Sequence, residues 1–194
     1  MEYRQVPMNV DHLACFDVLK GMNPPAWSDQ PIEYVHWLMD QDRKSTALNN
    51  LQGKIWLDGY KSGELRGEVF ADVPLALKRW HEEGVDVRIF SSGSALAQRL
   101  LFSSTAFGDL TVYLNGFFDT TIGAKDNPES YARIAKAFGC SSSEIAFISD
   151  VVRELDAAEQ AGMQVLLCVR PGNHPQPSHH HRVITELRQS SLQG

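Results

Sequence analysis

Cysteine is scarce in this sequence of 194 residues, and the three cysteines that are present form no pattern. Cys15, Cys140 and Cys168 are odd in number and far apart, and no two of them make a Cys-x-x-Cys pair. This spacing argues against a disulfide framework and gives no support to a cysteine-ligated zinc site. Unpaired cysteines of this kind are typical of a reducing compartment, so we expect a cytoplasmic protein.

Long hydrophobic runs and an excess of basic charge are also absent. The longest apolar run, Val165–Val169, is far shorter than the roughly 20 residues of a membrane-spanning helix. The first residues, MEYRQVPMNVDH, lack the charged and then apolar pattern of a secretory signal. Acidic residues outnumber basic ones by 24 to 18, giving a formal net charge of -6. Because nucleic acids and anionic membranes are themselves negative, we expect neither as a partner.

Two common nucleotide-binding motifs, Gly-x-x-x-x-Gly-Lys-Ser/Thr and Gly-x-Gly-x-x-Gly, are missing as well. What the chain does contain is Val85–Leu101, where a short apolar strand leads through Ser91-Ser92-Gly93-Ser94 directly into a helix. Hydroxyl groups and free amides at a helix N-terminus form a cradle for a phosphate group. An ordinary strand-to-helix turn is the alternative, since Ser and Gly are common turn residues.

The chain changes character near residue 67, after the glycine-punctuated segment Gly59–Gly67. Residues 1–67 are tryptophan-rich and show helical periodicity, as in the spacing of Ile32, Val35 and Met39. Residues 68–194 alternate helices with short buried strands, which predicts a parallel sheet with helices on both faces. We therefore predict a helical region over 1–67 and an α/β core over 68–194.

Within the core, capping residues, prolines and hydrophobic periodicity predict the positions of the elements. One expected helix has Asp72 as its N-cap, others begin at Ala95 and Pro128, and two more span Glu154–Ala161 and Val183–Gln189. The expected strands or apolar stretches are Val85–Phe90, Leu114–Phe118, Ile145–Ile148 and Val165–Val169. Ligands of such sheets bind at the carboxyl ends of the strands.

This rule selects the hydroxyls of Ser91 and Ser92, the lysine of the following loop, Lys125, and the aspartate after the next strand, Asp150. Hydroxyls and amides can hold phosphate oxygens, a lysine neutralises their charge, and an aspartate helps to hold a cation such as Mg²⁺. Each residue also has a structural alternative. Lys125 can be a solvated surface lysine, Asp150 a helix cap, and Glu154 a residue that favours the positive end of a helix.

The run His179-His180-His181 suggests a metal site, but we do not predict one. Consecutive residues cannot all face one ion from regular structure, and no acidic or cysteine partner is spaced nearby in the sequence. His36 and His81 are lone histidines on expected helices, where a structural role is the simpler interpretation.

Several segments resemble the haloacid dehalogenase superfamily and, within it, the enolase-phosphatase (acireductone synthase) family of methionine salvage. The resemblance covers about residues 30 to 175, and SSGSxxAQxLLF and VRPGN are its most specific parts. The segments that carry it, in order and spacing, are Gly53–Trp80, Arg88–Phe102, Phe117–Lys125, Phe147–Met163 and Val169–Asn173.

The resemblance implies a Rossmannoid parallel sheet with a small helical cap formed by the residues before Gly67. It implies that Ser91, Ser92 and Gly93 contact a substrate phosphate beside Lys125. Asp150 would bind Mg²⁺, with Glu154 as a possible supporting carboxylate. The family converts 2,3-diketo-5-methylthiopentyl-1-phosphate to its enol and then removes the phosphate. We therefore expect a small phosphate ester as the partner and a monomer.

One departure from the family is serious. The family's first strand ends in Asp-x-Glu-Gly-Thr, whose aspartate attacks phosphorus, and this sequence contains no such motif. Asp11 and Asp17 are followed two residues later by leucines, and Asp58-Gly59 is followed by Tyr60. We therefore expect an N-terminally shortened family member that lacks the nucleophile and a mid-sheet strand and is inactive as given.

Three other functions stay open. The chain could be a non-catalytic module that binds a phosphate ester or a partner, as expected if the nucleophile is absent. It could be another phosphatase of the same superfamily. It could also be a phosphosugar-binding, isomerase-like domain, although such a domain has no use for a metal-binding Asp150.

Overall fold

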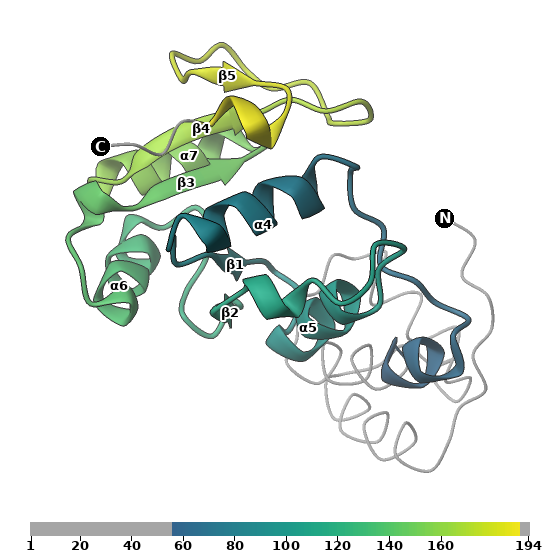
Figure 1. Cartoon of the computed structure of the whole chain (residues 1–194). Coiled ribbons are helices and arrows are strands. Elements are labelled where there is room, and N and C mark those ends of the chain that lie inside the picture. The colour runs from purple at the N-terminus through teal and green to yellow at the C-terminus, as the bar shows by residue number, and fades with distance from the viewer. Residues whose placement is uncertain (1–55, 191–194) are drawn as a thin grey trace, which may run out of the picture. The chain divides into compact units, whose positions relative to one another are not determined.

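The computed structural model describes residues 56–190, which divide into two compact units (Figure 1). The described residues of the first unit, called the small unit below, are 56–68 and 93–109, and those of the second, the α/β unit, are 69–92 and 110–190. Most of the predicted helical region 1–67, with Cys15 and His36, lies outside the described residues. The predicted domain assignment therefore stays a prediction.

The described part of the small unit contains two helices, one over residues 56–62 and α5 (Ala95–Ser103). As predicted, Ser94 is the N-cap of α5, and its side chain accepts a hydrogen bond from the Ala97 N–H at 3.2 Å. Gly67 approaches α5 so closely that a Cβ there would lie 2.0 Å from the Leu101 carbonyl oxygen. Only glycine fits at that position.

The α/β unit contains five strands, all in parallel pairs: β1 (Arg88–Phe90), β2 (Gly116–Phe118), β3 (Ala146–Ser149), β4 (Gln164–Cys168) and β5 (Val183–Ile184). They form two sheets, in the orders β1-β2 and β3-β4-β5, rather than the single sheet that the alternating pattern predicts. Among residues 56–190, β1 pairs only with β2, and β3 pairs only with β4.

Three helices complete the α/β unit: α4 (Val73–Glu82), α6 (Pro128–Phe138) and α7 (Val152–Gln160). Three short 3-10 helices also occur: η1 (Thr111–Tyr113), η2 (Ser142–Glu144) and η3 (Leu187–Gln189). The ends of α6 are those that the sequence predicts, with Pro128 in the first turn and Gly139 at the C-cap with φ of +76°. None of the helices within 56–190 has the length and apolarity needed to cross a bilayer.

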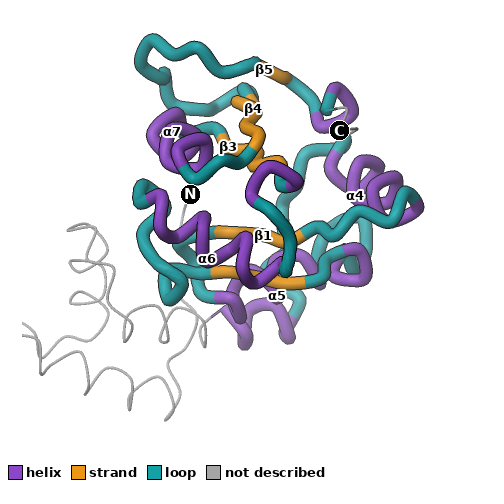
Figure 2. Tube along the Cα trace, turned by 90° about the vertical axis from the view of Figure 1, so that its left-hand side faces the viewer, coloured by secondary structure: helices purple, strands orange, loops and turns teal. Residues whose placement is uncertain are grey.

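The core forms where the helices cover the strands. Figure 2 shows α7 on one side of β3 and β4 and α4 on the other. Leu155 of α7 and Leu167 of β4 pack in one buried cluster, at 0% and 1% exposure. The fully buried Tyr131 of α6 links the two sheets, because its ring contacts Phe90 of β1 at 5.8 Å and Phe147 of β3 at 5.0 Å between centroids.

One local expectation is wrong. Val183–Gln189 is not a helix, because Val183 and Ile184 pair with Leu167 and Cys168 of β4 as strand β5, and the 3-10 helix η3 follows. Asp72 is the N-cap residue of α4, as predicted, although its side chain bonds to Arg170 and to the Leu187 N–H and makes no bond to the helix. In both places the group bonds to residues far away in the chain: Val183 and Ile184 pair with β4, and the Asp72 carboxylate pairs with Arg170. Local propensity is too weak to outweigh these contacts.

Candidate phosphate and metal site

The carboxyl ends of β1 and β3 and the loop after β2 converge on Lys125. The Lys125 ammonium lies 5.8 Å from the centroid of the Phe90 ring at the end of β1. The same ammonium forms an ion pair with Glu154, in the first turn of α7, with a distance of 2.6 Å between Nζ and Oε2. Residues from three segments distant in sequence are thus brought to one place, as the sheet-edge rule predicts.

Glu154 is the most buried charged group of this cluster. Its side chain is 9% exposed and that of Lys125 is 24% exposed. The Ser149 hydroxyl, at the end of β3, donates to the same Glu154 Oε2 at 2.9 Å and accepts from the Val151 N–H at 3.2 Å. The carboxylate therefore holds the lysine and the serine in fixed positions, which is more than the helix-end role that the sequence offers as an alternative.

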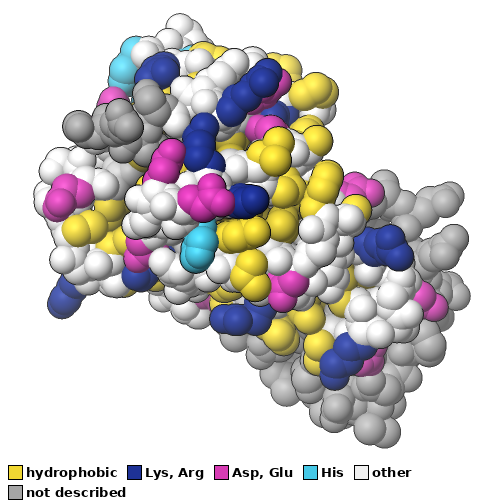
Figure 3. Space-filling model, in the orientation of Figure 1, with side chains coloured by type: hydrophobic (Ala, Val, Ile, Leu, Met, Phe, Trp, Pro, Cys, Tyr) yellow, Lys and Arg dark blue, Asp and Glu magenta, His cyan; other side chains and the backbone are white. Residues whose placement is uncertain are grey.

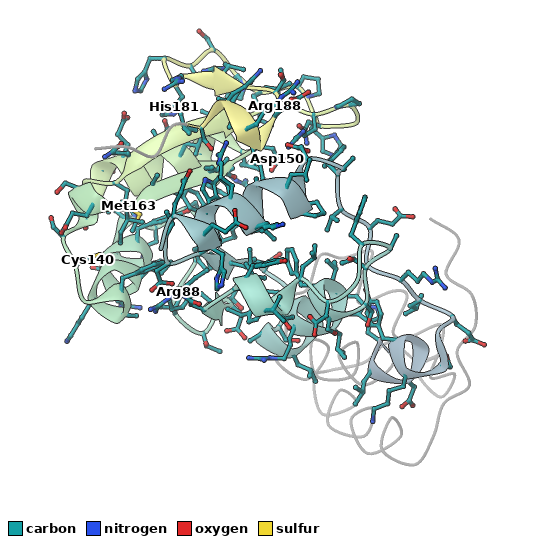
Figure 4. All side chains as sticks on the ribbon, viewed as in Figure 1. Arg88, Cys140, Asp150, Met163, His181 and Arg188 are labelled. Carbon is teal, nitrogen blue, oxygen red and sulfur yellow. The ribbon has the colours of Figure 1, made fainter. Side chains whose placement is uncertain are left out.

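Asp150 follows Ser149 and is exposed (Figure 4). Its Oδ2 accepts a hydrogen bond from Asn173 Nδ2 at 2.8 Å. The Asn173 Oδ1 in turn accepts from the Arg170 N–H, so the loop after β4 orients the aspartate. The N-cap residue of α7 is Val151, and therefore Asp150 is not the helix cap that the structural alternative assumes.

The predicted phosphate-binding residues are divided between the two units. Ser91 belongs to the α/β unit and extends the β1-β2 ladder, since its N–H donates to the Phe118 carbonyl at 3.1 Å. Ser92 is the exposed last residue of that segment. Gly93 belongs to the small unit, where its carbonyl accepts from Gln98 Nε2 at 2.8 Å. The roles of these three residues stay predictions.

Tyr131 of α6 holds the backbone of the loop that carries Lys125. Its hydroxyl donates to the Lys125 carbonyl at 2.6 Å. Burial, followed by the charges of Glu154 and Asp126, raises the pKa of the Tyr131 hydroxyl well above its ordinary value of 10.0. The hydroxyl therefore stays protonated and remains a donor throughout the physiological pH range.

The oxygen atoms present suit a hard cation such as Mg²⁺. Asp150 offers an exposed carboxylate, and Mg²⁺ in phosphoryl-transfer sites commonly takes one or two carboxylates together with waters and substrate phosphate. Glu154 already accepts from Lys125 and Ser149, so it is better placed to position these groups than to be the principal ligand. The residues fit a site with Asp150 as the protein ligand.

Residues 10–162 match the family model of haloacid dehalogenase-like hydrolases. The chain belongs to the haloacid dehalogenase-like hydrolase family. The fold class predicted from the motifs, a haloacid dehalogenase-like α/β fold with parallel strands, is thereby confirmed. Phosphatases of this family generally use a divalent metal ion, which agrees with the exposed carboxylate of Asp150.

Curated relatives within the haloacid dehalogenase-like family are named enolase-phosphatases. The chain is 47% identical to "Enolase-phosphatase E1" of Enterobacter sp. (strain 638), over 82% of this chain and 69% of that protein. It is 48% identical to the protein of the same name from Synechococcus elongatus, over 77% of this chain and 64% of that protein. It is 52% identical to a "Probable bifunctional methylthioribulose-1-phosphate dehydratase/enolase-phosphatase E1 1" of Vitis vinifera, over 75% and 28%.

Solved structures of haloacid dehalogenase-like proteins agree with this assignment. The UTR4 protein from Saccharomyces cerevisiae superimposes with a TM-score of 0.78 at 31% identity, covering 95% of this chain and 83% of that one. CbbY from Rhodobacter sphaeroides, crystallised in complex with phosphate, gives a TM-score of 0.61 at 11% identity, covering 92% and 87%. The second likeness shows the fold alone.

Sequence reasoning missed two contributors to the site, Ser149 and Asn173. In the sequence, Ser149 is marked only as the residue between an expected strand and Asp150, and Asn173 only as part of the VRPGN segment. A signal for Asn173 was available, because an asparagine in the loop after a neighbouring strand lies at the same sheet edge as Asp150. Nothing local marks Ser149 as the donor to Glu154.

Proposed function

We propose that this chain is an enolase-phosphatase of L-methionine salvage that acts on 2,3-diketo-5-methylthiopentyl-1-phosphate. The ion-paired lysine beside an exposed aspartate at the strand ends is the observation that carries the proposal. The names of the relatives at 47–52% identity support the substrate class. The chain spans 64% of the Synechococcus protein and 28% of the Vitis protein, so their activity enters here as a proposal.

The Lys125 ammonium is suited to bind the phosphate. An ammonium has three N–H donors, and the contact with Glu154 uses one of them. Because Glu154 and Ser149 hold the lysine in place, little side-chain freedom is lost when the remaining donors turn to a phosphate oxygen. Ser91 and Ser92, at the end of β1, add a backbone segment with hydroxyl groups on the same unit.

Asp150 would hold the cation, which we propose is Mg²⁺. Bound there, Mg²⁺ would neutralise the developing charge on the phosphate oxygens. Asn173 fixes one carboxylate oxygen of Asp150 and leaves the other for a ligand. We further propose a cytoplasmic monomer whose partner is the phosphate ester itself.

The second candidate function is a phosphate-ester-binding module without hydrolysis. It is favoured by a specific observation, since the sequence contains no Asp-x-Glu-Gly-Thr motif to supply the attacking carboxylate. Both functions use Lys125 and Asp150 in the same way. They differ in whether bound substrate releases phosphate.

Calorimetry and a phosphate-release assay on the full chain test both proposals. We expect the diketo phosphate ester to bind in the presence of Mg²⁺, and Lys125→Ala to weaken this binding at least about tenfold, because a charge-assisted hydrogen bond is lost. Asp150→Asn should remove the dependence of binding on Mg²⁺. Lys136→Ala, which removes an exposed lysine of α6, is the matched control and should change neither quantity.

Phosphate release that needs both Mg²⁺ and Lys125 would establish the enzyme. Binding that depends on Lys125 without any release would establish the module in its place. If the ester does not bind, or if it binds equally well to the Lys125→Ala and Lys136→Ala variants, both functions are excluded.

A further inference from the structure

Two histidines of the loop between β4 and β5 meet two carboxylates of α7. His180 Nε2 lies 2.9 Å from Glu159 Oε2, and His181 Nε2 lies 2.8 Å from Asp156 Oδ1. The acidic partners that the sequence does not place near the histidine run are thus supplied by the fold. Figure 3 shows histidine side chains on the surface at the end of the α/β unit where β5 lies.

His181 has an unsatisfied nitrogen in the interior. Its side chain is 0% exposed, and its Nδ1 has no hydrogen-bond partner among the described residues. When Nε2 carries the proton and donates to Asp156, the lone pair of the neutral ring lies on Nδ1. Buried polar atoms are normally paired, so this imidazole nitrogen is available to bind a ligand. A carboxylate that orients a histidine through its other nitrogen is the common support of a metal-binding histidine.

Three side chains of this cluster have the right chemistry for a cation. One ligand atom each from Glu159, His180 and His181 lies within 4.8 Å of the other two. Around a four-coordinate ion with bonds of about 2.0–2.1 Å, neighbouring ligand atoms are about 3.3 Å apart. Glu159 and His180 are exposed, so rotation of their side chains can bring the atoms to this spacing.

We propose that His180, His181 and Glu159 bind a divalent transition-metal ion, with Asp156 holding the His181 ring. Two imidazoles and one carboxylate favour Zn²⁺ and similar ions over Mg²⁺ and Ca²⁺, which prefer all-oxygen sites. The ion would fasten the loop before β5 to the last turn of α7. The role of the site is therefore structural, and water or a further side chain would complete the coordination.

This metal site is separate from the proposed phosphate site. Glu154 lies in the first turn of α7 and Glu159 in its last, which places them about 7.5 Å apart along the axis at 1.5 Å per residue. Figure 4 places Asp150 at the carboxyl end of β3 and His181 farther toward the end of α7. Loss of the metal site should therefore leave binding at Asp150 intact.

The proposal is tested by titrating the full chain with ZnCl₂ in the presence of excess Mg²⁺ and measuring the heat of binding by calorimetry. We expect one Zn²⁺ per chain and a rise in melting temperature of about 5 °C or more at saturating Zn²⁺. Glu159→Gln or His180→Ala should each weaken binding at least about tenfold. Both residues are exposed, so neither substitution should prevent folding.

Two controls make the test specific. His174→Ala removes an exposed histidine of the same loop, and Asp150→Asn alters the other proposed cation site; neither should change Zn²⁺ affinity. The proposal is overturned if the chain binds no Zn²⁺. It is also overturned if the double variant Glu159→Gln/His180→Ala binds Zn²⁺ as tightly as the His174→Ala variant does.

Discussion

Removing the Lys125 charge should destabilise the α/β unit more than removing the Glu154 charge. In Lys125→Met the Glu154 carboxylate keeps, among residues 56–190, only the Ser149 hydroxyl as a donor, and 9% of its side chain is exposed. In Glu154→Gln the lysine, at 24% exposure, can turn its ammonium toward water. The two substitutions thus break the same contact but leave different groups without a partner.

The magnitude follows from burial. Breaking a fully buried ion pair costs about 3–5 kcal/mol, whereas an exposed pair contributes about 0.2–1 kcal/mol. Because Lys125 retains some contact with water, we expect about 2 kcal/mol for Lys125→Met and about 1 kcal/mol for Glu154→Gln. The double variant leaves neither charge without its partner and should lose only about 1.5 kcal/mol of unfolding free energy. The coupling energy between Lys125 and Glu154 is then about 1.5 kcal/mol.

Urea unfolding followed by far-UV circular dichroism gives these free energies at pH 7 and 25 °C. The loss of about 2 kcal/mol should also lower the melting temperature by about 4–8 °C. The exposed pair Lys78–Glu82 of α4, with 61% and 64% of its side chains exposed, is the matched control. Its Lys78→Met variant should lose less than about 0.5 kcal/mol.

Additive losses would refute this reasoning. If the double variant loses the sum of the two single losses within about 0.5 kcal/mol, the side chains of Lys125 and Glu154 do not depend on each other. A loss for Lys125→Met no larger than that for Lys78→Met would show that burial of Glu154 does not make the contact costly to break.

Two further predictions concern the α/β unit away from Lys125. Burial raises the pKa of Asp72, but hydrogen bonds from Arg170 and the Leu187 N–H and the Arg170 charge outweigh it and lower this pKa below its ordinary 3.8. The free energy of unfolding of the wild type should therefore exceed that of Asp72→Asn by about 1–2 kcal/mol at pH 7. Urea unfolding at a series of pH values should show this difference vanish as the pH falls below 3.8 and through the lowered folded-state pKa. Ser130 is fully buried and its hydroxyl has no partner among the described residues, so Ser130→Ala should raise stability by about 1 kcal/mol. A lower melting temperature for Ser130→Ala would contradict this account.

The helix ends were predictable because their causes are local. Ser94 caps α5 through an N–H three residues away, and Pro128 and Gly139 delimit α6 through their own backbone angles. The placement of Lys125 and Asp150 in loops after the carboxyl ends of strands followed from the alternation of helices and strands, since this alternation favours parallel strands. These features need no knowledge of which distant residues meet.

The contacts that complete each site were not predictable, because they join residues far apart in the chain. Asp150 is oriented by Asn173, 23 residues later, and His181 by Asp156, 25 residues earlier. The same reason explains the error at Val183–Ile184, where the open edge of β4 selects a strand over the expected helix. A side-chain pattern records the preferences of its own segment and does not record which partner the fold brings to it.

The sequence by itself determined the family, the order of helices and strands before residue 183, and the residue types that can bind a phosphate and a cation. Only the tertiary structure decided that Glu154 pairs with Lys125 and that α7 brings carboxylates to the histidine run. The physical reason is that local propensities differ by about 1 kcal/mol per residue or less, proline excepted, whereas leaving a buried charged group without its distant partner costs several times more. Distant partners therefore decide which side chains become a site.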